Sequence, residues 1–263
     1  MKYLALFLLL LTLASAFIDS DFDGVGDEND KCPNSQFTDL VNSTGCTIKS
    51  LVKAHKFDVV MGVSFSQLDK NTFNVSDTIY KTYQIGYRYK DFTALASTST
   101  YKNDEDNGFN DTSLGLYYHF NGENNFSFIS GIEVILPTYE TNLDNEATDY
   151  SASVELVYLF EKFSLFNKIK YTFINDSNVD GITYQDTVDN STGVGYYILP
   201  SLYSSVSYNY SNSIYQGVEA LKNGSIYLYY ELDKDFFVTG DYAYGLSDSE
   251  SDNFISISLG YNF

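Results

Sequence analysis

The residues from Asp19 to Asp30 carry carboxylates at spacings that suit a metal ion. Acids occupy positions 1, 3, 5, 9 and 12 of this stretch, and Gly24 occupies position 6. Ca²⁺ prefers about six to eight oxygen ligands, and alternate residues of a tight loop aim their oxygens inward. Gly24 permits the sharp turn that such a loop needs. We therefore predict calcium ligands at these positions: Asp19, Asp21, Asp23, Val25 (through its carbonyl), Asp27 and Asp30.

Residues 1–16 have the features of a secretory signal peptide. Lys2 supplies a positive charge, an apolar run follows as far as Leu13, and Ala14-Ser15-Ala16 offers a small-residue cleavage site. An uncleaved anchor helix is the alternative, but the apolar run is short for spanning a membrane. The sequence therefore predicts export from the cytoplasm.

Two cysteines, Cys32 and Cys46, follow the acidic stretch. An even number of cysteines in an exported chain favours a disulfide, because the compartment is oxidising. The bond would close a loop of about fifteen residues, which stabilises a segment by about 3 kcal/mol in the chain-entropy model. We expect Cys32 and Cys46 to be paired.

Together, the acidic stretch and the two cysteines resemble a known type of repeat. The pattern Asp-x-Asp-x-Asp-Gly-x-x-Asp-x-x-Asp-x-Cys-Pro resembles a thrombospondin type 3 repeat. With the second cysteine after Gly45, the segment is similar to the calcium-binding linker of OmpA-like outer-membrane proteins. The resemblance covers residues 19–47 and implies a calcium-binding segment over residues 17–56. Such linkers usually lead into a peptidoglycan-binding domain. Because no such domain follows here, the resemblance does not imply peptidoglycan binding for this chain.

The composition restricts the class of protein. The formal net charge is −20, which excludes nucleic acid as a partner and favours cations. After the signal peptide no run approaches the ~18 apolar residues of a transmembrane helix. A membrane protein without such helices must be a closed β-barrel, because lipid cannot satisfy open backbone groups.

Residues 57–263 alternate between apolar and polar positions in stretches that suit strands. Short and long polar connectors separate these stretches in strict alternation, as in outer-membrane barrels with short periplasmic turns and longer outer loops. We therefore predict an all-β fold, a twelve-stranded antiparallel transmembrane β-barrel with both ends in the periplasm. The expected strands are 57–66, 79–89, 92–101, 112–120, 126–136, 150–160, 163–173, 191–198, 202–210, 224–232, 236–246 and 253–263.

The register of one hairpin can be predicted. If Phe160 faces Phe163 across a two-residue turn, Tyr158 faces Leu165 and Val154 faces Ile169 on the outer face, while Glu155 falls opposite Lys168 inside. Aromatic residues gather near the strand ends, which suits two headgroup layers and makes outer-membrane lipid a partner. Tyr101, Tyr150, Phe173, Tyr210 and Tyr244 are expected at the outer rim.

The last eleven residues alternate strictly and finish on Phe263. This ending resembles the closing strand of bacterial outer-membrane barrels, whose terminal aromatic residue is read by the barrel-assembly machinery. The resemblance implies a bacterial outer-membrane location, with the N-terminal segment in the periplasm and the assembly machinery as a partner.

The predicted barrel interior is polar and carries both signs of charge. No catalytic set is evident: neither His55 nor His119 has a nucleophile at a suitable spacing, and no zinc spacing occurs. We expect a small porin-like diffusion pore that passes small solutes or ions and is not an enzyme. A non-conducting structural or adhesive surface barrel is the alternative. The expected lumen residues are Asp58, Gln84, Arg88, His119, Glu133, Glu155, Lys168, Lys170, Asn209, Tyr227, Tyr229, Glu231 and Asp241.

Overall fold

The structure is a computed structural model that describes residues 25–32, 41–46, 55–68, 77–122, 125–139, 146–179 and 181–263. The chain divides into two units, residues 1–54 and 55–263. In the part of the chain that the structure describes, no helix is long and apolar enough to cross a membrane. The expected signal peptide and three of the expected calcium ligands, Asp19, Asp21 and Asp23, lie outside the described residues.

In the first unit, Cys32 and Cys46 form a disulfide with an S–S distance of 2.00 Å. The backbone beside it is also tied, because the Lys31 N–H donates to the Thr44 carbonyl at 2.9 Å. Asn42 Oδ1 accepts hydrogen bonds from the N–H groups of Thr44 and Cys46 at 2.9 and 3.1 Å. The predicted disulfide is therefore confirmed.

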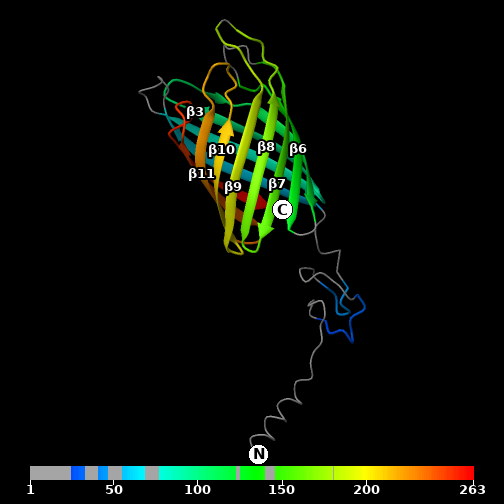
Figure 1. Ribbon diagram of the computed structural model, residues 1–263. Coiled ribbons are helices and arrows are strands. Elements are labelled where there is room, and N and C mark those ends of the chain that lie inside the picture. Colours follow the sequence, from blue (N-terminus) through cyan, green and yellow to red (C-terminus); the bar gives the residue numbers. More distant parts are fainter. Residues whose placement is uncertain are drawn as a thin grey trace, which may run out of the picture. The chain divides into compact units, whose positions relative to one another are not determined.

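The second unit is one antiparallel sheet of 13 strands (Figure 1). The strands are β1 (His55–Gln67), β2 (Thr78–Tyr89), β3 (Phe92–Lys102), β4 (Asn107–Phe109), β5 (Thr112–Asn121), β6 (Phe126–Leu136), β7 (Asp149–Phe160), β8 (Phe163–Phe173), β9 (Thr187–Leu199), β10 (Leu202–Ser211), β11 (Leu221–Glu231), β12 (Phe236–Gly245) and β13 (Asn253–Asn262).

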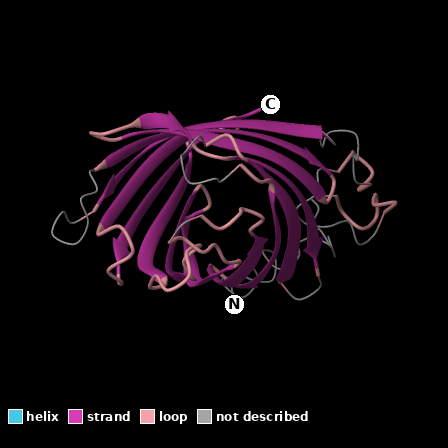
Figure 2. Ribbon diagram, turned by 90° about the horizontal axis from the view of Figure 1, so that it is seen from above, coloured by secondary structure: helices cyan, strands magenta, loops and turns pink. Residues whose placement is uncertain are grey.

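The sheet closes on itself, because neighbours in sequence pair around the ring and β1 pairs with β13 (Figure 2). The short strand β4 adds no position to the ring. It pairs with β3 at residues 100–102, and β5 pairs with the same edge of β3 at residues 92–97. The register shifts by one residue between the two pairings, as at a β-bulge. The predicted twelve-stranded antiparallel barrel is confirmed.

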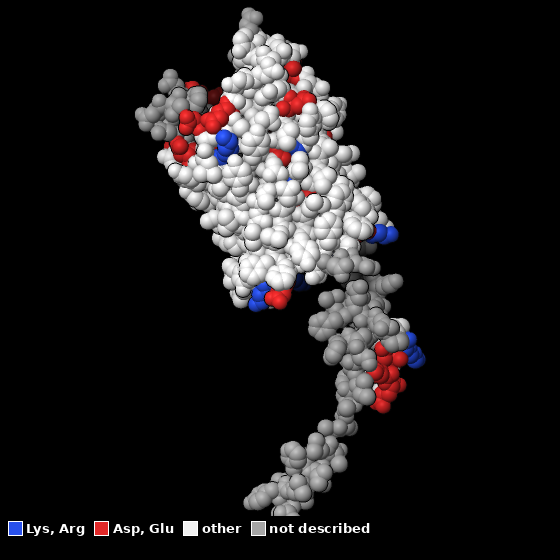
Figure 3. All heavy atoms as spheres, viewed as in Figure 1, with Lys and Arg blue, Asp and Glu red and all other residues white. Residues whose placement is uncertain are grey.

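The barrel has its apolar side chains on the outside. On β1, Val63 is 50% exposed while the adjacent Ser64 is 8% exposed, and a similar alternation runs along β7 and β13, whereas β3 shows little contrast. Among the described residues no hydrophobic side chain is fully buried. On the face shown in Figure 3 the barrel wall is nearly uncharged, and acidic residues gather toward the end with the longer loops. Such a surface suits an apolar solvent more than water.

Short turns fix the register of the hairpins. Lys90 and Glu161 have φ values of 52° and 51°, in the left-handed region that two-residue hairpin turns require at their first residue. Phe160 pairs with Phe163, and the predicted partners of Tyr158 and Val154 follow. The predicted register of this hairpin is confirmed at every pair that the sequence analysis named.

Three sequence expectations need correction. Strand β9 begins at Thr187 and β11 at Leu221, so residues 187–190 and 221–223 belong to strands and not to loops. Only Val188 and Leu221 among these residues are apolar, so the alternation of hydrophobicity was too weak to reveal them. Tyr101 lies on the inner face, because it is opposite Tyr80 and packs on Tyr139 at 5.5 Å between ring centroids. It is therefore not part of the outer aromatic rim.

Candidate pore lumen

Small and hydroxylated side chains line much of the inner face of the barrel. We call the end where two- or four-residue connections join β2 to β3, β5 to β6, β7 to β8, β9 to β10 and β11 to β12 the turn end, and the other the loop end. Most of the buried polar residues on the inner face carry a hydroxyl group: Ser64, Thr78, Ser151, Ser164, Thr172 and Ser205. Because side chains alternate across a strand, the register of the sheet assigns every other residue to this face.

The structure places all the expected lumen residues on the inner face. Arg88 is opposite Thr93, Glu231 is opposite Phe237, and Asp241 lies between Tyr227 and Ser256. The remaining members, placed by the same pairings, are Asp58, Gln84, His119, Glu133, Glu155, Lys168, Lys170, Asn209 and Tyr229.

Glu133 is the centre of a hydrogen-bonded network on the lumen wall. Its Oε2 accepts from Lys170 Nζ at 3.0 Å and from Ser151 Oγ at 3.0 Å. Tyr117 donates its hydroxyl to Oε1 of the same carboxylate. The network crosses β5, β6, β7 and β8, so one side chain couples four strands. Satisfied polar networks of this kind rigidify a structure.

Glu155 and Lys168 are direct cross-strand partners, as predicted, yet they form no ion pair within 4.0 Å. Lys170, two residues further along β8, instead reaches Glu133. Among the described residues Lys168 has no ion-pair partner, so no carboxylate neutralises its charge on the inner face.

Two inner-facing acids were missed by the sequence analysis. Asp149 is opposite Ile135 and 7% exposed, and its Oδ1 accepts from the N–H of Asn175 at 2.7 Å. Asp189 is opposite Lys170. Both lie near strand starts at the loop end. If the alternation of inner and outer residues is extended by one residue before the expected start of β7 and by two before that of β9, Asp149 and Asp189 fall on the lumen side.

A ladder of hydrogen bonds crosses the wall from β9 to the last loop. Ser191 Oγ donates to Asn209 Oδ1 at 2.6 Å, and Asn209 Nδ2 donates to Asn223 Oδ1 at 2.7 Å. Asn223 Nδ2 then donates to Glu250 Oε2 at 3.0 Å. The ladder borders a polar cavity of about 400 Å³ that also includes Lys168. It therefore fixes the loop after β12 against the wall.

Five aromatic rings lie on the inner face of β9 to β12. We call them the lumenal aromatic strip: Tyr197, Tyr203, Tyr227, Tyr229 and Phe237. Ring centroids are 4.9 Å apart for Tyr197 and Tyr203, 6.5 Å for Tyr203 and Tyr227, and 5.3 Å for Tyr229 and Phe237. The Tyr203 hydroxyl lies 3.0 Å from Ser164 Oγ, which ties the strip to β8.

Glycines on neighbouring strands let inner aromatic rings lie against the wall. A Cβ atom added to Gly131 would lie 2.4 Å from Cδ1 of Tyr117. One added to Gly260 would lie 2.0 Å from Cζ of Phe237. Any side chain at these positions would push the ring away from the wall and into the lumen.

At the loop end, Asp186 ties the start of β9 to the end of β8. The Tyr171 hydroxyl donates to Oδ2 of Asp186 at 2.5 Å, and the N–H of Ile174 donates to Oδ1 at 3.0 Å. Both hydrogen bonds hold the pKa of the Asp186 carboxyl below its usual value, and the one from Tyr171 has the larger effect. Burial raises the pKa of the loop residue Tyr215.

The two histidines have hydrogen-bond partners on neighbouring strands. His119 Nε2 lies 3.0 Å from Thr93 Oγ1, and His55 Nδ1 lies 2.6 Å from the Tyr87 hydroxyl. His119 faces the lumen near the turn end, and His55 is the first residue of β1.

Of the expected calcium ligands, Val25, Asp27 and Asp30 lie among the described residues. Asp30 Oδ1 accepts from the Cys32 N–H at 2.8 Å, so the acidic loop and the disulfide are linked. The N–H groups of Asn29 and Asp30 donate to the Gly26 carbonyl at 2.8 and 3.0 Å, which folds this stretch into a turn. Among the described residues, no group of three or more His, Cys, Asp or Glu side chains is placed to hold a metal ion.

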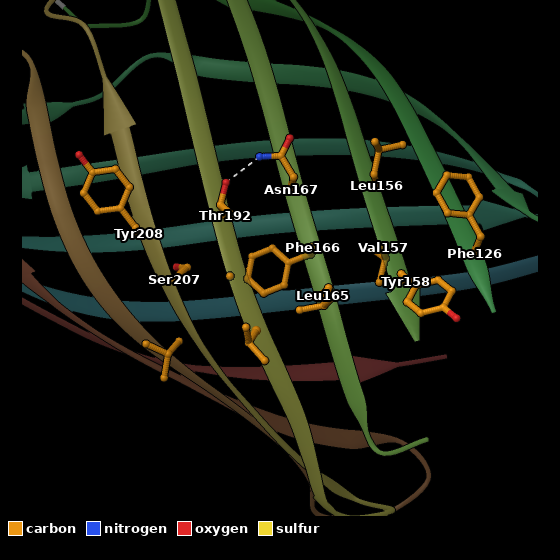
Figure 4. Close-up of a pocket in the computed structure, with 13 residues that line it drawn as sticks. Phe126, Leu156, Val157, Tyr158, Leu165, Phe166, Asn167, Thr192, Ser207 and Tyr208 are labelled. Atoms are coloured by element: carbon orange, nitrogen blue, oxygen red, sulfur yellow. Dashed lines mark hydrogen bonds between the residues drawn. The ribbon is translucent and has the colours of Figure 1, made fainter. Parts of the chain in front are cut away.

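A groove of about 730 Å³ on the outer wall extends over β6 to β10 (Figure 4). Apolar side chains such as Leu156 and Leu165 surround one polar pair. Asn167 Nδ2 donates to Thr192 Oγ1 at 2.7 Å, which satisfies both groups where the surroundings are apolar. The groove is on the face opposite to the lumen and takes no part in the candidate pore.

Comparisons with known proteins show the fold. No protein-family model matches the chain, and no curated protein matches its sequence. An outer-membrane channel from Pseudomonas putida F1 has a TM-score of 0.61 at 10% identity, over 80% of this chain and 95% of that chain. The NanC porin has a TM-score of 0.54 at 12% identity, over 78% and 98%. The β domain of the Bordetella autotransporter BrkA has a TM-score of 0.50 at 11% identity, over 80% and 99%. The chain has the fold of these outer-membrane β-barrels.

Proposed function

We propose that the second unit spans a bacterial outer membrane and is a small porin-like diffusion pore. The observation that carries the proposal is the division of the closed barrel into an apolar outer wall and a polar inner wall with unpaired charges. A twelve-stranded barrel is wider than eight-stranded barrels, whose interiors side chains fill. Two of the structures similar in fold are named as a channel and a porin, and this supports the proposal.

Planar-bilayer conductance of the purified protein tests the pore. We expect discrete current steps in KCl, and variants of lumen residues should change their size. Absence of steps from protein that is folded, as judged by its heat-dependent migration in gels, would reject the pore. A structural or adhesive barrel would then be the better account.

We also propose that the segment over residues 17–56 binds Ca²⁺ in the periplasm, in the manner of the linkers that it resembles. Asp30 would hold the ion while also receiving the Cys32 N–H, so that the disulfide positions this ligand. Bound Ca²⁺ would order the segment and neutralise part of its dense negative charge.

A further inference from the structure

The inner face from β9 to β12 combines acids and aromatic rings without a base. The five strands β9 to β13 contain one Lys or Arg, Lys222, and it lies on the outer face opposite Tyr210 and pairs with Glu219 at 3.5 Å. The inner face of the same strands carries Asp189, Glu231 and Asp241. This wall of the lumen is therefore negative along its length.

Asp241 and Tyr227 lie side by side without a hydrogen bond or ion pair to the residues that the structure describes. They are direct cross-strand neighbours near the middle of β12 and β11. Among the residues that the structure describes, neither side chain makes a hydrogen bond or an ion pair. Both are only partly exposed. Polar groups in partly closed surroundings usually have partners, so a free acceptor and a free hydroxyl at one place indicate a site for a solute.

The lumenal aromatic strip includes Tyr227 and so lies beside Asp241. Tyr203 is in ring contact with Tyr227, and Tyr229 follows two residues later on the same inner face. β9, β10 and β11 run side by side (Figure 1), and ring contacts join Tyr197 to Tyr203 and Tyr203 to Tyr227 across them. Aromatic faces attract cations through the ring quadrupole, and this attraction is strongest for cations that shed water easily.

We propose that this wall binds an organic cation, of the quaternary-ammonium or alkylamine class, during its passage through the lumen. Asp241 supplies the counter-charge, and the rings of Tyr203 and Tyr227 contact the apolar groups around the nitrogen. The proposal rests on the pore function and adds a solute class to it.

The basic side chains named as lumen residues do not repel a cation at this site. Lys170 is engaged by Glu133 on the side of β6, and Lys168 lies on β8 outside this wall. Arg88 comes within electrostatic range of Tyr229, at the turn end of the strip. A cation is therefore expected beside Asp241 and not beside Glu231, where Arg88 would repel it.

Tetramethylammonium tests the site in planar bilayers. We expect added tetramethylammonium to reduce the K⁺ current, and Asp241→Asn or Tyr203→Leu to raise the half-blocking concentration by about tenfold. Tyr208→Leu, on the outer face of β10, is the matched control and should leave block unchanged. Equal block in the wild type and in both lumen variants would overturn the proposal. Block by the neutral sugar maltotriose without block by tetramethylammonium would also overturn it.

The test separates the site from the pore. K⁺ current without tetramethylammonium block leaves the pore standing and rejects the site. If the protein carries no current, calorimetry of the detergent-solubilised full chain with tetramethylammonium decides, and heat that Asp241→Asn abolishes supports the site. If Asp241→Asn does not fold, Tyr227→Leu replaces it, because loss of the aromatic ring should weaken block.

Discussion

Lys170 Nζ lies 3.0 Å from Glu133 Oε2, so an ion pair joins β8 to β6 across the intervening strand β7. Glu133 also accepts from Tyr117 and Ser151. Removing this carboxylate leaves three polar groups without their acceptor in a partly closed site, and such losses cost about 1–3 kcal/mol. We therefore expect Glu133→Ala to lower the free energy of unfolding in urea by that amount.

Glu155→Ala is the matched control for this prediction. Glu155 faces the same lumen from the neighbouring strand β7 but has no hydrogen bond or ion pair among the described residues. Its removal should change stability by about 0.5 kcal/mol or less, as surface substitutions do. Equal losses in the two variants would show that the network does not stabilise the barrel.

Lys168 is predicted to set the ion preference of the pore. Its ammonium has no ion-pair partner among the residues that the structure describes, and acids dominate the inner face around it. Lys168→Glu should raise the ratio of K⁺ to Cl⁻ permeability by about twofold or more, measured from reversal potentials in a KCl gradient. Lys162→Glu, in the turn after β7, should have a smaller effect. An unchanged ratio in Lys168→Glu would place this residue outside the ion path.

Gly131 is predicted to keep Tyr117 against the wall. Gly131→Ala places a methyl group where Tyr117 now lies, so the ring must move and its hydrogen bond to Glu133 is lost. Overpacking of this kind costs about 1–3 kcal/mol, and a displaced ring should also reduce the unit conductance. Gly240→Ala is the control, because its added Cβ would meet its nearest atom at 3.9 Å. Similar behaviour of the two variants would contradict this role for Gly131.

The sequence predicts most of the barrel because alternation and turn chemistry are local signals. The Phe160–Phe163 hairpin follows from a two-residue turn and matched apolar positions, and the structure has that register. Side-chain contacts between strands that are two places apart in the sheet do not follow from these local signals. The sequence correctly predicted that Glu155 lies opposite Lys168. It did not predict the ion pair of Lys170 with Glu133, because that pair depends on how far the lysine side chain reaches across β7.

The lumenal aromatic strip shows another limit of the sequence. Tyr197 and Tyr203 meet because the register shifts by one residue between the Leu202 and Tyr203 pairings. Alternation alone predicts which residues share a face but does not predict such a bulge. Tyr227 and Asp241 were both assigned to the lumen from sequence, whereas their lack of partners is visible only when the neighbouring strands are in place.

Asp186 is predicted to make the loop end of β8 and β9 sensitive to acid. Hydrogen bonds from Tyr171 and the Ile174 N–H lower the pKa of its carboxyl. A group with a lowered pKa in the folded state contributes stability above its unfolded pKa of about 3.9, and this is lost as the pH falls through the folded value. Amide exchange at Ile174 should therefore accelerate, after correction for intrinsic rates, below about pH 4. Asp186→Asn should remove the pH dependence, and a wild-type protein without it would contradict the prediction.

Calcium binding is predicted for the full chain with a dissociation constant of about 10⁻⁴–10⁻³ M, the range of extracellular modules. Asp23 occupies position 5 of the acidic stretch, and Asp23→Ala removes one of its carboxylates. Calorimetry of the detergent-solubilised protein should show Ca²⁺ heats that this substitution abolishes. Asp91→Ala, in the turn between β2 and β3, removes the same charge from the barrel and should leave the heats unchanged. Identical heats for wild type and Asp23→Ala would place any bound calcium elsewhere, because a hard cation loses most affinity when one carboxylate of its ligand set is removed.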